Sequence, residues 1–417
     1  NKKCIDVIVL DHHQSEIKLP KALAIINPNR IDDSSNLNYL CAAGVTLMFL
    51  TALNNKLRRL NWFKKNEINE PDLINFLDLV CLGTICDVVP LIGLNRAFVK
   101  QGLKIIKSRK NTGIKILYDS ISVDGAPNTY QLGYLIGPRI NAGGRVGKSS
   151  HGSDLLMTKN ISKAYGIALD LQKYNDERKF LENTLIDKVD KEAQKNLKDP
   201  LFVLSGNNWH EGIIGIVASR IKDKYNKPTF VISLNNNKGK GSARSVYGFD
   251  IGSSIISAVH SSLLIRGGGH KMAGGFSIDE SKIPDFKSFL IEGFKKSKAF
   301  HNRKSHIYID SEISSTALNE DFFNEINKLS PFGSGNSEPK FLLENVKVLN
   351  SYIVGKKHLK IVFLGKNRKT FKGIAFNIIG SVMEGYLSSN YKKNMHIVGK
   401  LSLNEWRGKR NIEFIID

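Results

Sequence analysis

The first 115 residues alternate between two hydrophobic patterns. A short apolar run at 5–10 ("IDVIVL") has the length and the β-branched content of a strand. The stretches 38–57 ("NYLCAAGVTLMFLTALNNKL") and 71–91 ("PDLINFLDLVCLGTICDVVPL") carry helical patterns. Because strands alternate with helices, this part of the chain is predicted to be an α/β fold with a parallel sheet.

The middle of the chain changes character twice. Residues 129–148 ("TYQLGYLIGPRINAGGRVGK") contain Gly, Pro and two arginines and are predicted to form a loop. Residues 153–197 form one long, polar-rich helical pattern without Pro and with a single interior Gly. A helix of that length and charge usually connects domains. A second α/β unit follows and ends near residue 300.

The last part of the chain, residues 305–417, reads as short strands separated by turns, with one helical pattern at 319–329 ("NEDFFNEINKL"). Such a pattern predicts a small closed β-barrel of the OB type. We therefore divide the chain into four segments. They are 1–150 (parallel-sheet α/β domain), 151–198 (long connecting helix), 199–300 (second α/β domain) and 301–417 (OB-type barrel).

Composition adds the expected setting. With 417 residues and 41% apolar residues, the chain is long enough for two or three domains with their own cores. The four cysteines form no C-x-x-C pair, which suits a reducing cytoplasm. The apolar run at 41–53 is shorter than the roughly 20 residues that span a bilayer, so we expect no membrane segment.

The net charge is +22, which favours a polyanionic partner, either a nucleic acid or an anionic membrane surface. Part of this charge can reflect coding bias, because the chain is also rich in Lys, Asn and Ile. The charge alone therefore does not decide between these partners.

The first candidate site follows the first apolar run, as Asp11, His12 and His13. The carboxyl end of a parallel strand is where ligands bind in doubly wound folds. Adjacent residues in an extended chain point in opposite directions. One imidazole could therefore bind a divalent metal and the other a phosphate, while Asp11 fixes an imidazole tautomer. The alternative is a polar loop after a strand.

Three later segments offer groups that suit a phosphate. Arg139, Asn141 and Arg145 lie in "GPRINAGGR", a glycine-rich segment whose backbone could approach an anion closely. Ser242 and Arg244 in "GSARS" share one face if the chain is extended there. The alternatives are a solvated loop for the first segment and a turn for the second.

The third segment is "GGGHKMAGGF", in which Gly268 and Gly269 let the backbone run close to a nucleotide and His270 can donate to a phosphate. A tight hairpin is the alternative here. His210, in "NWHEGIIGIVASR", is a weaker candidate near a predicted helix start, where free N–H groups favour anions.

The predicted barrel has a basic stretch at 355–372 with Phe363 and Phe371 interleaved. Cations along a backbone and aromatic rings for stacking are typical of proteins that bind single strands. We expect Lys356, Lys357 and Lys360 to contribute to this binding. A solvated β face with inward-facing phenylalanines is the alternative.

Taken in order, these motifs resemble the DHH phosphoesterase superfamily, and in particular its RecJ-type single-strand-specific exonucleases. The resemblance rests on "VIVLDHH", "GTICDVVPL", "GPRINAGGRVG", "WHEGIIGIVASRI", "GSARSVYGFDI", "GGGHKMAGGFSI" and "PFGSGNSEPKF", and covers nearly the whole chain. It implies a partial DHH domain, a long helix, a DHHA1 domain at 199–300 and an OB-type domain.

The resemblance also implies roles for the candidate residues. His12 and Asp87 would be metal ligands, and His13 would contact the scissile phosphate with Asp11 in support. Ser242 and Arg244 would hold the terminal 5′-phosphate. The ions would be Mn²⁺ or Mg²⁺, and two of them about 4 Å apart could activate a water and stabilise the leaving oxygen.

One departure from the family changes what we expect of this chain. The family has two earlier motifs, a D-x-D and a further aspartate, that supply much of the two-metal site, and the sequence starts after them. It also starts without Met or a leader, so we expect residue 1 to be a cut. We expect these residues alone to be inactive or nearly so, and to be a fragment of an active enzyme.

The function implied is a 5′ to 3′ exonuclease that releases mononucleotides from single-stranded DNA in recombination and repair. Its expected partners are a single-stranded DNA with a 5′ end, a helicase and a single-strand-binding protein, and we expect a monomer. Two alternatives stay open. One is a DHH phosphodiesterase of short oligonucleotides, although such relatives usually lack the terminal barrel. The other is a noncatalytic DHH relative that binds single strands.

Overall fold

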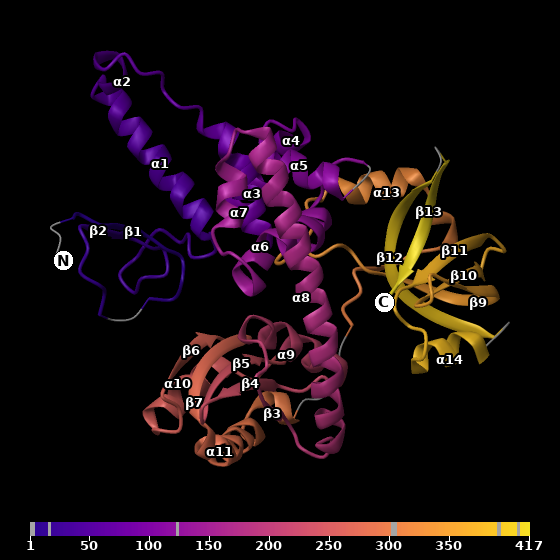
Figure 1. Cartoon of the computed structure of the whole chain (residues 1–417). Coiled ribbons are helices and arrows are strands. Elements are labelled where there is room, and N and C mark those ends of the chain that lie inside the picture. The colour runs from indigo at the N-terminus through magenta and orange to yellow at the C-terminus, as the bar shows by residue number, and fades with distance from the viewer. Residues whose placement is uncertain (1–4, 16–17, 122–124, 302–306, 390–392, 407–408) are drawn as a thin grey trace. The chain divides into compact units, whose positions relative to one another are not determined.

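The computed structural model describes residues 5–15, 18–121, 125–301, 307–389, 393–406 and 409–417 (Figure 1). Packing divides the chain into two compact units. Unit 1 contains residues 1–110, 124–133 and 306–417, and unit 2 contains residues 111–123 and 134–305. The four segments defined from the sequence remain our proposal for the domain boundaries.

The amino-terminal part of unit 1 pairs two short parallel strands, β1 (Ile8–Leu10) and β2 (Ala24–Ile26), with Ile8 opposite Ala24. The predicted parallel pairing is confirmed. The helical elements that follow are α1 (Ala42–Arg59), α2 (Trp62–Lys65), the 3₁₀ turn η1 (Leu73–Phe76), α3 (Leu77–Cys86) and α4 (Gly93–Lys107).

Helix α3 is apolar on nearly every side because it is the core helix of this part. Leu77, Val80 and Cys81 are buried in it, and burial raises the pKa of the Cys81 thiol. Helix α4 packs tightly on α3 at Gly102, where a Cβ would lie 2.3 Å from the carbonyl oxygen of Leu77. This close contact holds the first turns of α3, and Asp87 follows the last residue of the helix.

Helices form where a loop was predicted. Residues 129–148 contain a π-helical segment, η2 (Gln131–Ile136), followed by α6 (Gly137–Val146), so the loop prediction is wrong. Pro138 lies in the first turn of α6, where a missing N–H costs no hydrogen bond. Gly143 lets the helix pack closely, since a Cβ there would lie 2.7 Å from the carbonyl oxygen of Lys148.

The long helix is confirmed, but it starts later than predicted. Helix α8 spans Ile161–Lys195, and the separate helix α7 (His151–Met157) ends before it. The break is set by Asn160, whose side chain accepts a hydrogen bond from the N–H of Lys163 (2.9 Å) and caps α8. Helix α5 (Thr112–Ser120) also packs on α8.

A five-stranded mixed sheet forms the rest of unit 2, in the order β3-β4-β5-β7-β6. Its strands are β3 (Phe202–Asn207), β4 (Thr229–Asn235), β5 (Lys238–Arg244), β6 (Arg266–His270) and β7 (Ala273–Asp279). Its helical elements are α9 (Glu211–Tyr225), α10 (Ile251–His260), η3 (Glu280–Lys282), α11 (Ile283–Lys295) and α12 (Lys298–His301).

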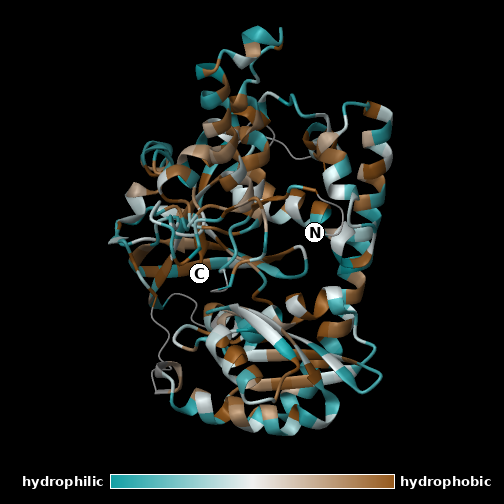
Figure 2. Ribbon diagram, turned by 90° about the vertical axis from the view of Figure 1, so that its left-hand side faces the viewer, coloured by the Kyte–Doolittle hydropathy of each residue, from teal (hydrophilic) through white to brown (hydrophobic). Residues whose placement is uncertain are grey.

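This sheet has an apolar core on one face, where Phe230, Phe276 and Phe286 contact one another edge to face or tilted. A second apolar cluster joins α8 and α9 to β3 and β4. In Figure 2 the central strands are mainly hydrophobic, whereas the flanking helices alternate hydrophobic and hydrophilic residues. The face of β5, β6 and β7 opposite the phenylalanine core is left for the site described below.

The carboxyl-terminal part of unit 1 is a closed barrel, as predicted. The strands are β8 (Ser311–Glu312), β9 (Phe341–Val354), β10 (His358–Leu364), β11 (Thr370–Ala375), β12 (Asn394–Trp406) and β13 (Lys409–Ile416). Strand β9 pairs with both β12 and β10, which closes the ring. Its helical elements are η4 (Ser315–Ala317), α13 (Glu320–Asn327) and α14 (Val382–Ser389).

Candidate functional site

The Asp11-His12-His13 triplet lies where β1 ends. The N–H of Asp11 donates to the carbonyl oxygen of Ile26 (3.0 Å), which continues the pairing with β2 by one residue. Asp11 Oδ1 accepts from the N–H of His12 (2.8 Å), from the N–H of His13 (3.2 Å) and from His13 Nδ1 (2.8 Å). A carboxylate only accepts, so Nδ1 of His13 carries the proton and Nε2 is left for another partner.

These contacts also set the charge of Asp11. Partial burial raises its pKa, but the hydrogen bonds from the His13 side chain and from the N–H groups of His13 and His12 outweigh burial. The pKa of Asp11 therefore lies below its ordinary value, and the carboxylate is ionised at neutral pH.

The two histidines have different surroundings. The His12 side chain is 16% exposed, and its Nε2 lies 3.4 Å from Asp87 Oδ2. The His13 side chain is 68% exposed. The structure thus brings together the two predicted metal ligands, His12 from the end of β1 and Asp87 from the end of α3.

Two asparagines that the sequence analysis did not single out hold the histidine backbone. Asn27 Nδ2 donates to the carbonyl oxygen of His13 (2.9 Å), and Asn29 Nδ2 donates to that of His12 (2.7 Å). Asn27 Oδ1 in turn accepts from the N–H of Asn29 (2.8 Å). The sequence "NPN" directly after the second apolar run could have identified these two asparagines. Parallel strands end at the same edge of a sheet, so residues that follow the second strand lie near those that follow the first.

An imidazole nitrogen and a carboxylate oxygen at this separation suit one divalent ion such as Mn²⁺. Within the residues that the structure describes, no group of three or more His, Cys, Asp or Glu side chains could hold a metal. His12 and Asp87 would supply two ligands of such an ion.

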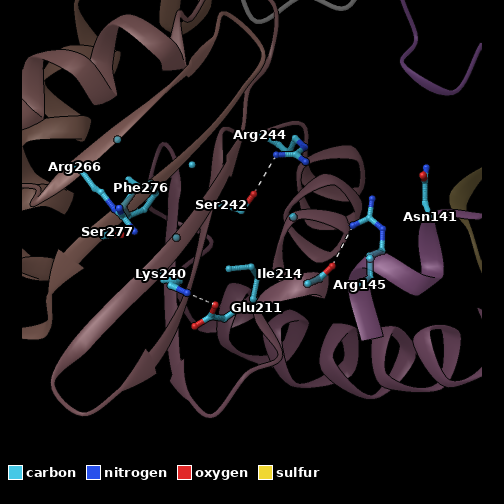
Figure 3. Close-up of a pocket in the computed structure, with 16 residues that line it drawn as sticks. Asn141, Arg145, Glu211, Ile214, Lys240, Ser242, Arg244, Arg266, Phe276 and Ser277 are labelled. Carbon is cyan, nitrogen blue, oxygen red and sulfur yellow. Dashed lines mark hydrogen bonds and ion pairs between the residues drawn. The ribbon is translucent and has the colours of Figure 1, made fainter. Parts of the chain in front are cut away.

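A second candidate site is a cavity of about 910 Å³ in unit 2 (Figure 3). It is lined by α6, by the start of α9 and by one face of β5, β6 and β7. Its polar and charged lining side chains include Asn141, Arg145, Lys240, Ser242, Arg244 and Arg266. A volume of this size accommodates a whole small ligand.

Ser242 and Arg244 share one face of β5, as expected for an extended segment. Arg244 Nη1 donates to Ser242 Oγ (3.2 Å) and to the carbonyl oxygen of Ala243 (2.8 Å). Helix α9 approaches at Gly215, where a Cβ would lie 2.9 Å from Ser242 Oγ. Burial lowers the pKa of Arg244, and the charge of Arg145 adds to this effect. The ordinary pKa of arginine is so high that the guanidinium stays charged.

Arg145 supplies the second guanidinium of the cavity. Its Nη1 donates to the carbonyl oxygen of Gly212 (3.1 Å). Gly212 is required there because a Cβ would lie 2.4 Å from the carbonyl oxygen of Arg145. Burial lowers the pKa of Arg145; Arg178 lowers it further, and Glu182 opposes this.

Neither of the two cavity guanidinium groups forms an ion pair with a described residue. Glu182, which favours the charged form of Arg145 at longer range, is itself paired with Arg178 (3.0 Å) and Arg220 (3.5 Å). Two half-buried guanidinium groups without an ion-pair partner make a site that an anion would stabilise.

The remaining predicted residues lie elsewhere in unit 2. Arg139 is held inside the helical layer by Gln172 Oε1 and the carbonyl oxygen of Leu135 (both 2.7 Å). His210 caps α9, because its Nδ1 accepts from the N–H of Gly212 (3.2 Å). Gly268, Gly269 and His270 belong to β6, which forms the hairpin with β7, and none of the three lines the cavity.

The barrel corrects two expectations. Phe363 and Phe371 stack on each other (5.3 Å) inside the core and are buried, so they are not available to bases. Lys360 is mostly buried and forms an ion pair with Glu413 (2.6 Å), so it is not a free cation. Tyr352 on β9 and Phe376, directly after β11, are exposed aromatic residues of the barrel. The ring of Phe376 lies 5.1 Å from that of His358.

Comparisons with known proteins agree with this architecture. The family models of the DHH family N-terminal domain, the DHHA1 domain and the RecJ OB domain match residues 1–84, 198–296 and 309–417. The class of protein is thus a DHH-family protein with a DHHA1 domain and a RecJ-type OB domain.

The relatives identify the family. The chain is 31% identical to the single-stranded-DNA-specific exonuclease RecJ of Dickeya dadantii, over 100% of this chain and 73% of the relative. It is 35% identical to the RecJ of Haemophilus influenzae, again over 100% and 73%. The chain belongs to the RecJ family of single-stranded-DNA-specific exonucleases.

A solved structure agrees. RecJ of Thermus thermophilus in complex with Mn²⁺ matches with a TM-score of 0.79 and 28% identity, over 100% of this chain and 58% of that chain. The chain thus spans less than two thirds of that crystallised protein. In the described part of this chain, no helix has the length and apolar character needed to cross a bilayer.

Proposed function

We propose that the protein is a single-stranded-DNA-specific exonuclease that works from the 5′ end and releases mononucleotides. The observation that carries the 5′ direction is the cavity of unit 2, where the half-buried Arg145 and Arg244 lie near the hydroxyl of Ser242 and form no ion pair with a described residue. A terminal phosphate, with its two charges and three oxygens, complements such a group of donors.

We propose that His12 and Asp87 are ligands of a divalent ion, Mn²⁺ or Mg²⁺, in a centre that takes two ions in the active enzyme. When bound, the ions supply an activated water and neutralise charge on the phosphodiester. Asp11 keeps the proton of His13 on Nδ1, which leaves Nε2 of His13 to contact the scissile phosphate. Asn27 and Asn29 keep the two histidines in position through their backbone carbonyl groups.

The expected setting of this enzyme is DNA recombination and repair in the cytoplasm, where it acts as a monomer beside a helicase and a single-strand-binding protein. The barrel supports binding of the strand beyond its 5′ end, because it is closed, basic and carries exposed aromatic side chains. We propose that Tyr352 and Phe376 are the stacking residues in place of Phe363 and Phe371.

The test uses the full-length protein with Mn²⁺ and a 5′-phosphorylated, single-stranded DNA labelled along its length. We expect mononucleotides to be released from the 5′ end, and a blunt duplex of the same sequence to resist. Cleavage confined to dinucleotides would instead favour the phosphodiesterase, and binding without any release would favour a noncatalytic protein. His12→Ala is the matched variant, since it removes a proposed metal ligand and should abolish release.

A further inference from the structure

The cavity of unit 2 has a second cationic end that the 5′-phosphate does not use. Side chains alternate along a strand, so Lys240, Ser242 and Arg244 of β5 share the face that lines the cavity. Pairing with β7 places Ser277 opposite Lys240, and pairing of β7 with β6 places Arg266 opposite Ser277. Lys240, Ser277 and Arg266 therefore form one row across three strands, which we call the outer row.

The next row across the sheet has almost no side chains. It consists of Ser242, Gly275 and Gly268, in register on β5, β7 and β6. A Cβ at Gly275 would meet only the carbonyl oxygen of Gly241, at 3.8 Å, and a Cβ at Gly268 would meet nothing within 4 Å. Packing does not demand glycine at these two positions.

Neighbouring glycines of the same hairpin behave differently. A Cβ at Gly274 would lie 2.4 Å from Ile255, and a Cβ at Gly267 would lie 2.6 Å from the same side chain. Those two glycines are needed for α10 to pack on the sheet. The open space above Gly275 is thus not a by-product of tight packing, and a ligand can fill it.

The outer row carries a net positive charge. Lys240 forms an ion pair with Glu211 (2.6 Å), at the first turn of α9. Arg266 is exposed on the edge strand β6, and no described residue forms an ion pair with it; Figure 3 shows it beside Ser277. Two cations and one carboxylate leave an excess of one positive charge, together with the hydroxyl of Ser277.

The spacing separates this end from the 5′-phosphate site. Successive residues on one face of a strand are about 7 Å apart. The outer row therefore lies about 7 Å along the sheet from Ser242 and about 14 Å from Arg244, measured between backbone positions. One phosphate group cannot contact both ends of the cavity, whereas two phosphates of one ligand can.

We propose that Arg266, Lys240 and Ser277 form a second phosphate subsite in this cavity. The proposal rests on the proposed function, because it assumes that Ser242, Arg244 and Arg145 hold the 5′-phosphate. The second phosphate is then part of a 5′-polyphosphate end, because the first internucleotide phosphate is the one that mononucleotide release cleaves at His12, His13 and Asp87.

The test measures equilibrium binding of single-stranded oligonucleotides to the full-length protein in EDTA, so that no cleavage occurs. Three ligands are compared: a 5′-hydroxyl, a 5′-monophosphate and a 5′-triphosphate. The variant is Arg266→Ala, which removes an exposed side chain from an edge strand and should leave the fold intact. Lys295→Ala on α11 is the control, because it removes the same charge from an exposed position of unit 2 outside the cavity.

We expect Arg266→Ala to weaken binding about tenfold for the ligand that fills the subsite. A loss confined to the triphosphate identifies a polyphosphate end. An equal loss for the monophosphate and the triphosphate would place Arg266 in the monophosphate site and overturn the separate subsite. Equal, small changes for all three ligands in Arg266→Ala and Lys295→Ala would also overturn it. The proposed function fails separately, if the wild type does not prefer a 5′-monophosphate to a 5′-hydroxyl.

Discussion

Replacing Arg244 by alanine should change ligand binding and protein stability in opposite directions. In the unliganded protein the Arg244 guanidinium is half-buried, has no carboxylate partner in the described part of the chain and is repelled by Arg145. Burial and this repulsion lower its pKa, which means that the folded state disfavours the charged form. Removing the charge therefore relieves a cost of folding, and this relief offsets the lost packing of the side chain.

In the ligand-bound state, Arg244→Ala is expected to be unfavourable instead, because it weakens binding. A hydrogen bond to a charged group contributes about 1.5–3 kcal/mol, so Arg244→Ala should reduce the preference for a 5′-phosphate over a 5′-hydroxyl roughly 10- to 100-fold. Binding along the rest of the strand should change little. We expect the melting temperature without ligand to be unchanged or higher, as is usual where function requires an uncompensated charge.

The assay pairs a thermal melt with anisotropy titrations of 5′-phosphate and 5′-hydroxyl strands. Ser242→Ala serves as the matched variant, because it removes a neutral partner and should cost less, about 0.5–1.5 kcal/mol of binding. A strongly destabilised Arg244→Ala protein with an intact 5′-phosphate preference would refute the reasoning, since it would show that Arg244 acts in packing.

Three further outcomes are expected. Glu182→Gln should lower the free energy of unfolding by about 3 kcal/mol in a denaturant titration, because it leaves buried Arg178 without its counter-charge, whereas the exposed Glu292→Gln should have no measurable effect. Asn29→Ala should weaken Mn²⁺ binding about tenfold by calorimetry while the fold is retained, and unchanged affinity would remove Asn29 from the support of His12. Lys357→Ala should reduce the salt slope of DNA binding by about 0.7, whereas Lys360→Ala should lower barrel stability with little change in slope, because Lys360 is paired with Glu413.

Elements with a strong local pattern could be predicted from the sequence. The strand before Asp11, the long helix and the barrel strands all follow from hydrophobic periodicity over a few residues. The same alternation could have placed Phe363 correctly, because Leu359, Ile361 and Phe363 fall on one face of β10 and are all buried. The prediction that Phe363 stacks on bases overlooked this two-residue alternation.

Other features depend on contacts between distant parts of the chain. The segment around Arg139 contains Pro and several glycines, which indicate a loop locally, but it forms α6, in which Gly143 packs closely against the backbone of Lys148. The ion pair of Lys360 requires Glu413, which lies two strands away in the barrel. Likewise, the pairing of His12 with Asp87 depends on how α3 packs, although the family resemblance predicted both residues.

The net charge of +22 could not locate a nucleic-acid site, since part of it can come from coding bias. The burial and the ion pairs of each side chain distinguish cations of a candidate site from ordinary surface cations, which the net charge of the chain cannot do. Many lysines and arginines of this chain form ion pairs on the surface, where each pair contributes little and salt screens it. Arg145 and Arg244 are the opposite case, because they are partly desolvated, line the same cavity and form no ion pair with a described residue. Partly desolvated cations in a cavity mark a candidate anion site, so the position of these two arginines locates the proposed phosphate site more closely than the charge of the whole chain does.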